Sequence, residues 1–179
     1  VGQCAGHEAA TALDVALVVV GAGSARILPP NANAHGAGLG EWAKGFFVFD
    51  ASVPVVNGSH PALDEGDVDC SLGQSGKVWF LETAPGIDGP YERRCSVPSG
   101  TTLYVPVWQW VCSPDLDGIE VDPCLAEADA AFAAFDLGLS VDGVSLDNAA
   151  LDAYRASTGR FDLPLGEDGY WELACGCEL

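Results

Sequence analysis

The stretch TTLYVPVWQWV, residues 101–111, decides the expected fold because it is the clearest strand pattern in the chain. It is rich in β-branched and aromatic residues, and cysteines at positions 95 and 112 lie on either side of it. Because side chains alternate between the two faces of a strand, Tyr104, Trp108 and Trp110 are predicted to share one face. Pro106 has no backbone N–H to donate, so it predicts an edge strand or a bulge.

The shared aromatic face has two interpretations. Tryptophans two positions apart on a strand lie about 7 Å from each other, close to the spacing of neighbouring sugar rings. Tyr104, Trp108 and Trp110 are therefore candidates for binding a carbohydrate. The alternative is a strand buried on both faces, where aromatic side chains pack as core. The sequence leaves both interpretations open.

The rest of the chain alternates short strand patterns with two helical ones. Strand patterns occur at KVWFLE (77–82), LSVDGVSL (139–146), GRFDLPLG (159–166) and YWELA (170–174), and the second predicts a hairpin turning at Asp142 and Gly143. The alanine-rich run 124–137 predicts a helix, with Pro123 near its start. Trp42, Phe46 and Phe49 recur at helical spacing, which predicts a shorter helix nearer the N-terminus.

Together these patterns predict a mainly β fold. The expected architecture is a single β-sandwich or jelly-roll-like domain over residues 26–179, with one inserted α-helix and a short N-terminal helix. Residues 1–25 are treated separately, because ALDVALVVVGAGSA (12–25) is a short apolar run followed by small residues, as in a degenerate signal or leader segment. The alternative for this run is a buried strand from Leu13 to Val20. The run is too short to span a membrane.

Charge and cysteine content limit the compartment and the partners. The 179 residues contain 26 acidic and 7 basic side chains, a formal net charge of -19, which disfavours nucleic acid and anionic membranes as partners. Seven cysteines without a C-x-x-C pair argue against zinc and haem, and the glycine-rich stretch before Lys77 lacks the length of a nucleotide-binding loop. Disulfides in an oxidising compartment are expected, which predicts a secreted or cell-surface protein.

Several motifs together resemble those of a family of uncharacterised secreted bacterial proteins. They are LGEWAKGFFVFDASVP (39–54), CSLGQSGKVWFLE (70–82), ERRCSVPSGTTLYVPV (92–107), SVDGVSLDN (140–148), YRASTGRFDLPLG (154–166) and DGYW (168–171). The resemblance spans residues 27–171, and its most specific elements are the GQSGxVWFL and CxVPxGxxLxxPV strands. It implies secretion but no activity, so it assigns no catalytic residue.

The resemblance also implies how cysteines pair. It predicts one disulfide between Cys70 and Cys95 and another between Cys112 and Cys124. Family members continue after GYW into a closing strand, whereas this sequence ends in ELACGCEL (172–179). The difference predicts a truncated or frameshifted tail and leaves Cys4, Cys175 and Cys177 without assigned partners.

The acidic loop between the second pair of cysteines is a candidate calcium site. Asp115, Asp117, Glu120 and Asp122 lie within eight residues of each other, and carboxylates are the ligands that Ca²⁺ prefers. The Cys112–Cys124 disulfide would hold the loop closed and lower the entropy cost of ordering it. An EF-hand is excluded because the twelfth position counted from Asp115 is Ala126. The alternative is a solvated acidic loop.

Two glutamates are candidates for catalysis. Glu82 and Glu172 lie beside aromatic residues and could serve as the two carboxylates of a glycoside hydrolase. Arg93 and Arg94 are expected to form structural ion pairs, with the alternative of binding a substrate carboxylate. The favoured interpretation is a non-catalytic, secreted binding or surface protein, stabilised by calcium, whose partner is a glycan or another extracellular protein. The alternatives are a secreted hydrolase using carboxylates and a carbohydrate-binding module.

Overall fold

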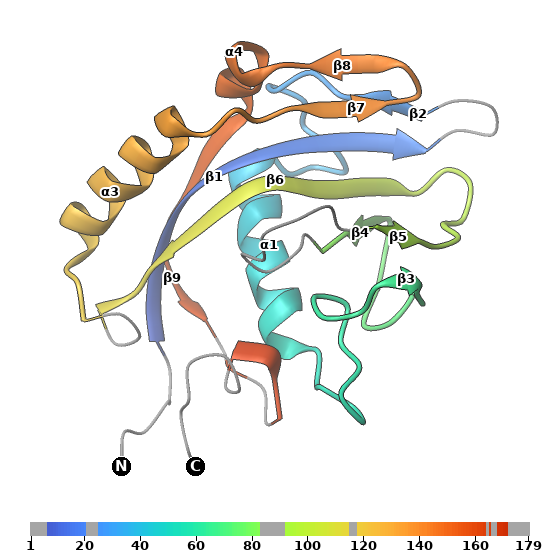
Figure 1. Ribbon diagram of the computed structural model, residues 1–179, viewed down its shortest axis with the longest axis horizontal. Helices are drawn as coiled ribbons and strands as arrows, with labels where there is room; N and C mark the ends of the chain where they lie inside the picture. Colours follow the sequence, from blue (N-terminus) through green and yellow to red (C-terminus); the bar gives the residue numbers. More distant parts are fainter. Residues whose placement is uncertain are drawn as a thin grey trace.

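The longest strand runs through the middle of a five-stranded sheet (Figure 1). This strand is β1 (His7–Val20), and β6 (Thr102–Cys112) pairs antiparallel with one of its edges. Its other edge is shared by β9 (Arg155–Leu163) and β2 (Ala25–Ile27), both antiparallel to β1. A short strand, β4 (Val78–Phe80), lies parallel to the start of β6 and completes the sheet. The sheet therefore joins segments from both ends of the chain.

The computed structural model describes residues 7–20, 25–82, 92–114, 118–163, 165 and 168–171, with only the backbone described before residue 25. Strand β1 includes most of the segment that has a leader-like composition. The strand alternative for that segment, Leu13–Val20, matches the element found here, which begins six residues earlier at His7. Over this stretch Leu13 pairs with Gln109 of β6 and with Ala156 of β9.

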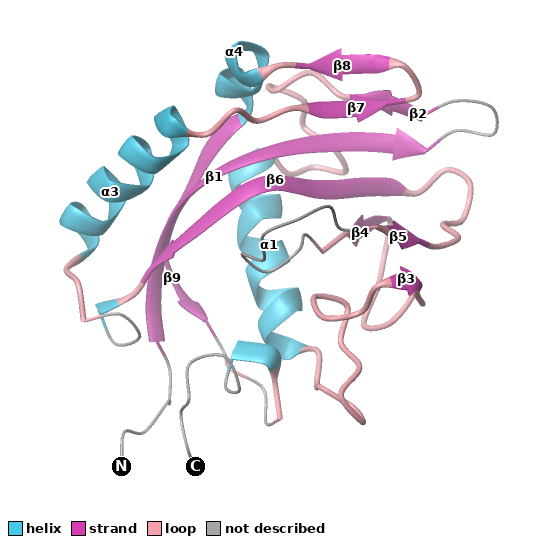
Figure 2. Cartoon of the chain, viewed as in Figure 1, coloured by secondary structure: helices cyan, strands magenta, loops and turns pink. Residues whose placement is uncertain are grey.

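The remaining elements surround this sheet (Figure 2). They are helices α1 (Leu39–Ser52), α3 (Val121–Ala134) and α4 (Asn148–Leu151), the 3₁₀ turn η1 (Asp152–Tyr154), the hairpin β7 (Leu139–Val141)–β8 (Val144–Leu146), and the parallel pair β3 (Gly66–Asp67) and β5 (Arg93–Arg94). The hairpin turns where predicted: Asp142 and Gly143 have φ values of 48° and 81°, as a tight hairpin requires.

Helix α1 lies across the sheet and forms the main core with it (Figure 1). Its apolar residues recur at helical spacing, so Phe46 and Phe47 are both fully buried. Phe46 stacks on Tyr104 of β6, with ring centroids 5.6 Å apart. Gly40 lets the helix approach β9 closely, because a Cβ at this position would lie 2.8 Å from the carbonyl oxygen of Ser157. The predicted helix around Trp42, Phe46 and Phe49 is thus confirmed.

The fold class agrees with the prediction only in part. Strands and an inserted helix are present, and α3 begins three residues before the predicted 124–137 helix and ends three residues before its predicted end. A β-sandwich or jelly roll is not what the described residues form, because the second layer against the large sheet is α1 rather than another sheet. Tyr170 and Trp171 are helical, so the strand predicted at YWELA is wrong for these two residues. None of the helices in the described ranges is long and apolar enough to cross a membrane.

Both disulfides implied by the family resemblance are present. One joins Cys70 to Cys95, and the other joins Cys112, at the end of β6, to Cys124 in the first turns of α3. Two disulfides in a chain of this size indicate an oxidising compartment. The second disulfide lies in a small buried cluster with Val121, so it ties α3 to the end of the sheet.

Removal of the Cys112–Cys124 disulfide is expected to destabilise the protein by about 3 kcal/mol. The two cysteines are 12 residues apart, and loop-closure entropy gives about this value for a loop of that length. Guanidinium unfolding of the Cys112→Ser/Cys124→Ser variant measures the loss. A Ser140→Ala/Ser145→Ala variant in the exposed hairpin is the control and should stay within about 0.5 kcal/mol of the parent. A loss below about 1 kcal/mol for the cysteine variant would contradict the prediction.

Candidate functional site

The aromatic residues of β6 do not share one face, because the strand contains a bulge. Asp14 pairs with Trp108 and Val15 with Pro106, so Val107 is an extra residue in β6. The bulge predicted from Pro106 is therefore confirmed. An extra residue reverses the alternation of side chains beyond it, and Tyr104 ends on the opposite face from Trp108.

The contacts of these side chains agree with that reversal. Tyr104 is fully buried against α1, and Val111 also packs on this main core. Trp108 instead lies 5.8 Å from Phe132 of α3, measured between ring centroids. The Trp110 indole N–H lies 3.3 Å from the Cys124 sulfur. The predicted three-residue carbohydrate platform is wrong in its geometry: Tyr104 is inaccessible, and α3 packs against the two tryptophans.

The acidic loop is only partly described. Asp115 and Asp117 lie outside the described residues, while Glu120 and Asp122 are exposed at the start of α3. Within the described ranges, no cluster of three or more potential metal-ligating side chains is found. Calcium binding by the loop stays a prediction.

An acidic side chain that the sequence analysis did not single out is buried in the core. Asp50 is 2 % exposed and lies in the last turn of α1, on the same helical face as Ala43, Phe46 and Phe47. Positions three and four residues apart share one face of a helix, so a carboxylate three residues after Phe47 occupies a core position. The sequence signal for Asp50 is therefore its spacing from Phe47, which places an acidic residue on the apolar face of a predicted helix.

Asp50 forms a buried pair with Glu82, the carboxylate that follows β4. The two side chains lie within hydrogen-bonding reach of each other, and the Trp171 indole donates to Asp50 Oδ2 at 2.5 Å. Burial raises the pKa of Asp50 to about 6, against the opposing effects of the Trp171 and Glu82 hydrogen bonds. Burial raises the pKa of Glu82 well above its usual value, and the neighbouring Asp50 charge raises it further.

Each carboxyl group of this pair has one buried oxygen that accepts no hydrogen bond from a described residue. These oxygens are Asp50 Oδ1 and Glu82 Oε1. A buried acceptor without a donor is costly, and two close carboxylates repel each other. A single proton held between the two groups removes both costs. The arrangement therefore favours a carboxyl–carboxylate pair that shares a proton.

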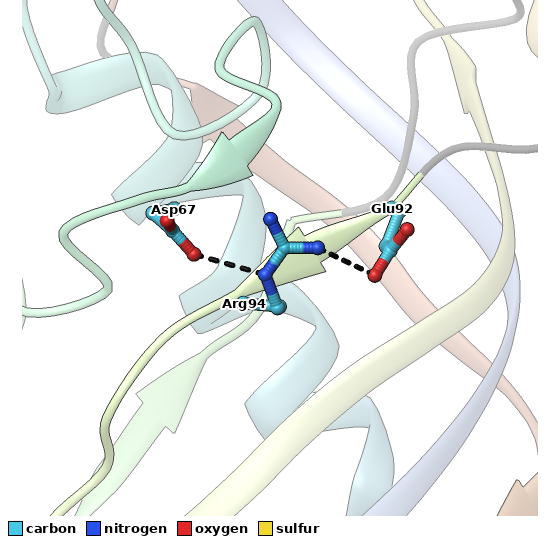
Figure 3. Close-up of polar contacts among 3 residues, drawn as sticks. All are labelled: Asp67, Glu92 and Arg94. Atoms are coloured by element: carbon cyan, nitrogen blue, oxygen red, sulfur yellow. Dashed lines mark hydrogen bonds and ion pairs between the residues drawn. The ribbon is translucent and has the colours of Figure 1, made fainter.

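Arg93 holds the backbone around Glu82 in place. Its guanidinium donates to the carbonyl oxygens of Asp64, Glu82 and Ala62 at 2.6, 2.7 and 2.7 Å. These bonds join the loop after α1 to the end of β4, and the positive charge lowers the pKa of Glu82 in part. The hydrogen bonds described for Arg93 go to backbone carbonyls, and the ion pair predicted for it stays a prediction. Arg94 does form the predicted ion pairs, with Asp67 at 2.9 Å and Glu92 at 2.6 Å (Figure 3).

A buried histidine packs beside Asp50. His60 is fully buried and stacks on Tyr170, with ring centroids 5.4 Å apart. Its Nδ1 accepts the backbone N–H of Ala62 at 3.0 Å, which places the ring proton on Nε2. Burial lowers the pKa of His60, although the backbone carbonyls of Asp50 and Val53 partly oppose the shift. His60 is therefore neutral at pH 7.

Two hollows are lined in part by the Cys70–Cys95 disulfide. We call the smaller, of about 120 Å³, the deep pocket; it is lined by Pro61, Asp64, Val68, Asp69, Cys70, Gln74, Phe80, Leu81, Glu82, Arg93 and Cys95. We call the larger, of about 530 Å³, the shallow groove; it is lined by Asp67, Val68, Asp69, Cys70, Arg94, Cys95 and Ser96. Val68, Asp69 and the disulfide line both, so the hollows adjoin. Glu82 connects the deep pocket to the buried carboxyl pair.

The chemistry available here is polar and acidic. Two carboxyl groups in hydrogen-bonding contact are closer than the separation of about 5 Å or more that glycoside hydrolases use. The predicted partner Glu172 lies outside the described residues. The site could instead hold a polar ligand next to Glu82 or transfer a proton to it. In comparisons with known proteins, no family model, no curated protein and no solved structure matches this chain.

Proposed function

We propose that the chain is a secreted, disulfide-linked binding protein whose ligand site is the deep pocket and the adjoining shallow groove. The observation that carries the proposal is the position of Glu82: its side chain lines the deep pocket, and one of its buried oxygens accepts no hydrogen bond from a described residue. Concave sites with a few convergent polar groups and a displaced pKa are where small ligands bind most often. Secretion is supported by the two disulfides and by the family resemblance.

Filling the shared wall of the two hollows tests this site. Val68→Phe adds a ring where both hollows meet, and Val144→Phe adds the same ring at an exposed position of the β7–β8 hairpin. Both ¹⁵N-labelled variants are screened by NMR against a library of polar fragments. Fragments that shift the amide signals of residues 67–70 and 80–82 should bind the parent and Val144→Phe but not Val68→Phe. Equal binding to all three proteins would place the ligand site elsewhere.

A second candidate is a hydrolase that uses carboxylates, and the proton-sharing Asp50–Glu82 pair favours it. Such a pair can accept a proton from water on one group and donate one from the other. Chromogenic ester, peptide and glycoside substrates would be tested between pH 4 and 8. Glu82→Gln should abolish any hydrolysis, while Glu65→Gln, an exposed acid outside both hollows, should not. Hydrolysis that survives Glu82→Gln would exclude this mechanism.

We also propose a glycan or another extracellular protein as the partner, and calcium as the cofactor. A glycan would have to bind in the shallow groove or at what remains accessible of Trp108 and Trp110, since both tryptophans are only partly buried. Another extracellular protein could bind the acidic surface through electrostatic complementarity.

Calcium binding by the loop between Cys112 and Cys124 is expected to raise the melting temperature of the oxidised protein. A ligand present at about 100 times its Kd adds about 2.7 kcal/mol to the free energy of unfolding. Thermal melts with excess Ca²⁺ and with chelator measure the shift, and Asp117→Asn/Asp122→Asn should remove it. Glu127→Gln, an exposed acid on α3 outside the loop, serves as the control. An unchanged melting temperature of the parent protein would contradict calcium binding and favour the alternative, a solvated acidic loop.

A further inference from the structure

The two disulfides differ in how far solvent reaches them. Cys112 is 0 % exposed and Cys124 is 2 % exposed, and both lie in the small buried cluster with Val121. Cys95 is exposed and Cys70 is half-buried, and both line the deep pocket and the shallow groove. Thiol–disulfide exchange requires an external thiolate to reach a sulfur atom, so its rate depends on access. Of these two disulfides, Cys70–Cys95 is the one that a thiolate can reach in the folded protein.

Beside the Cys70–Cys95 disulfide, β3 and β5 are joined by weak contacts within the described part of the chain. The strands pair over two residues each, and the N–H groups of Gly66 and Val68 donate to the backbone carbonyls of residues 92 and 94 at 2.9 and 3.0 Å. The ion pair of Asp67 with Arg94 has side chains that are 86 % and 59 % exposed, so solvent screens it (Figure 3). A short two-stranded pair is marginally stable by itself. The disulfide is therefore the strongest link between β3 and β5.

Arg93 connects this pair of strands to the hollows. It lies in β5, lines the deep pocket, and donates to the carbonyl oxygens of Ala62, Asp64 and Glu82. Because Cys95 lies two residues after it, the disulfide holds the strand from which the Arg93 guanidinium reaches these carbonyls. Movement of β5 away from β3 therefore moves Arg93 as well and opens one wall of the deep pocket.

We infer that the Cys70–Cys95 disulfide is a redox-sensitive latch on the deep pocket and the shallow groove, which an external dithiol opens by reduction. An oxidising compartment keeps the latch closed, since the disulfide persists there. Reduction leaves β3 and β5 held by exposed contacts and by the Arg93 hydrogen bonds, so the two strands separate more often. The hollows then lose the wall that they share. The effect on ligand binding rests on the proposed function, whereas the latch itself can be tested without a ligand.

The reduction proceeds in two exchange steps. A thiolate of the dithiol attacks Sγ of Cys95, the more exposed of the two cysteines. The S–S bond breaks, and its electron pair leaves on Sγ of Cys70, which takes a proton from solvent. The second thiol of the dithiol loses its proton and attacks the mixed disulfide, which releases Cys95 as a thiolate that is then protonated. The protein gains two electrons and two protons, and the dithiol loses the same number as it closes into a disulfide.

Selective reduction is the first test. Thiols that are free in the oxidised protein are blocked with N-ethylmaleimide, and the protein is then treated with dithiothreitol at pH 8. Thiols released at each time are trapped with isotope-labelled N-ethylmaleimide, and the labelled peptides are identified by mass spectrometry. The cysteines at 70 and 95 should be labelled at least about a hundredfold faster than those at 112 and 124. In guanidinium, where burial no longer distinguishes the disulfides, the two rates should approach each other.

Hydrogen exchange measures whether reduction opens the strands. The amides of Gly66 and Val68 should exchange at least about tenfold faster in the selectively reduced protein, while the amides that join β1 to β6 keep their rates. Cys70→Ser/Cys95→Ser should reproduce the faster exchange without reductant. Cys112→Ser/Cys124→Ser, the matched control, should leave both amides unchanged. Reduction of the parent protein keeps the test decisive if the first variant fails to fold.

The outcomes separate the latch from the proposed ligand site. Equal rates of reduction of the two disulfides in native buffer, or unchanged exchange at Gly66 and Val68 after reduction, would overturn the latch. For fragments that bind the hollows of the oxidised parent, the Kd should rise at least about tenfold after selective reduction. An unchanged Kd would keep the site and reject the latch. If no fragment binds the oxidised parent while reduction is selective and speeds exchange, the proposed site fails and the latch stands.

Discussion

Replacing Phe47 by alanine is expected to lower the free energy of unfolding by about 4 kcal/mol. Phe47 is fully buried and contacts three aromatic rings: Phe46 on its own helix at 5.6 Å, Phe161 of β9 at 6.3 Å and Trp171 at 6.3 Å, between centroids. Losing its ring removes contacts between α1 and Phe161 of β9, and between α1 and Trp171, the residue that donates to Asp50. The cavity left by the ring can close only if α1, β9 or the segment of Trp171 moves, which adds to the loss.

Urea unfolding of the oxidised protein, followed by tryptophan fluorescence, measures this loss. Phe135→Ala is the matched control. It removes the same side-chain volume, but Phe135 is 51 % exposed at the end of α3. The control should stay within about 0.5 kcal/mol of the parent. Comparable losses for the two variants would mean that α1 does not form the core with β9.

The sequence predicted the local elements of this fold well and their assembly less well. The spacing of Trp42, Phe46 and Phe49 predicted α1 because one stripe of the helix packs on the core. The turn at Asp142 and Gly143 predicted the hairpin because few residues accept its dihedral angles. These signals lie within a few residues of each other. The signal for the layer that covers the sheet is not local. Whether a helix or a second sheet covers it depends on contacts between segments that are distant in the sequence.

The candidate site shows the same division. Glu82 was a candidate because it ends a strand beside aromatic residues, but its partner could not be predicted. Asp50 lies 32 positions earlier in the chain, and only the approach of α1 to β4 brings the two carboxyls together. The prediction of one aromatic face on β6 was wrong for a different reason. A single extra residue, Val107, reverses the face to which every later side chain of the strand points. Pro106 indicated a bulge but not its position in the pairing.

The stability of the protein is expected to fall as the pH rises from 4 to 8, because of the Asp50–Glu82 pair. The pKa of Asp50 is about 6 in the folded protein and 3.8 in the unfolded chain, so the folded state holds more protons between these values. The free energy of unfolding therefore decreases with pH across this window, by about 3 kcal/mol for Asp50 alone at 1.36 kcal/mol per pKa unit. The raised pKa of Glu82 adds a loss in the same direction, which begins as the pH rises through 4.5.

Two other effects overlap with this trend and must be separated from it. The lowered pKa of His60 acts in the opposite direction, since its contribution to stability is lost as the pH falls below 6.5. The net charge of -19 acts in the same direction, because repulsion among surface carboxylates also grows with pH. Both effects are common to the parent and to a variant changed only at the pair. The informative quantity is therefore the difference between the two at each pH.

In Glu82→Gln, an amide of the same shape replaces the carboxyl group whose pKa is raised. The amide can donate a hydrogen bond to Asp50. At pH 4 both carboxyls of the parent are protonated, so the variant and the parent should be nearly equal in stability. At pH 8 the parent must either keep a proton on the buried pair or hold two charges there. The variant needs to do neither, because the glutamine does not titrate.

Between pH 5 and 8 we therefore expect the free energy of unfolding of the variant to rise by at least about 1.4 kcal/mol relative to that of the parent. Glu65→Gln, changed at an exposed acid, should show a constant difference. Parallel curves for Glu82→Gln and the parent would mean that the two carboxyls do not share a proton, because only a group that titrates differently in the folded state can change the slope.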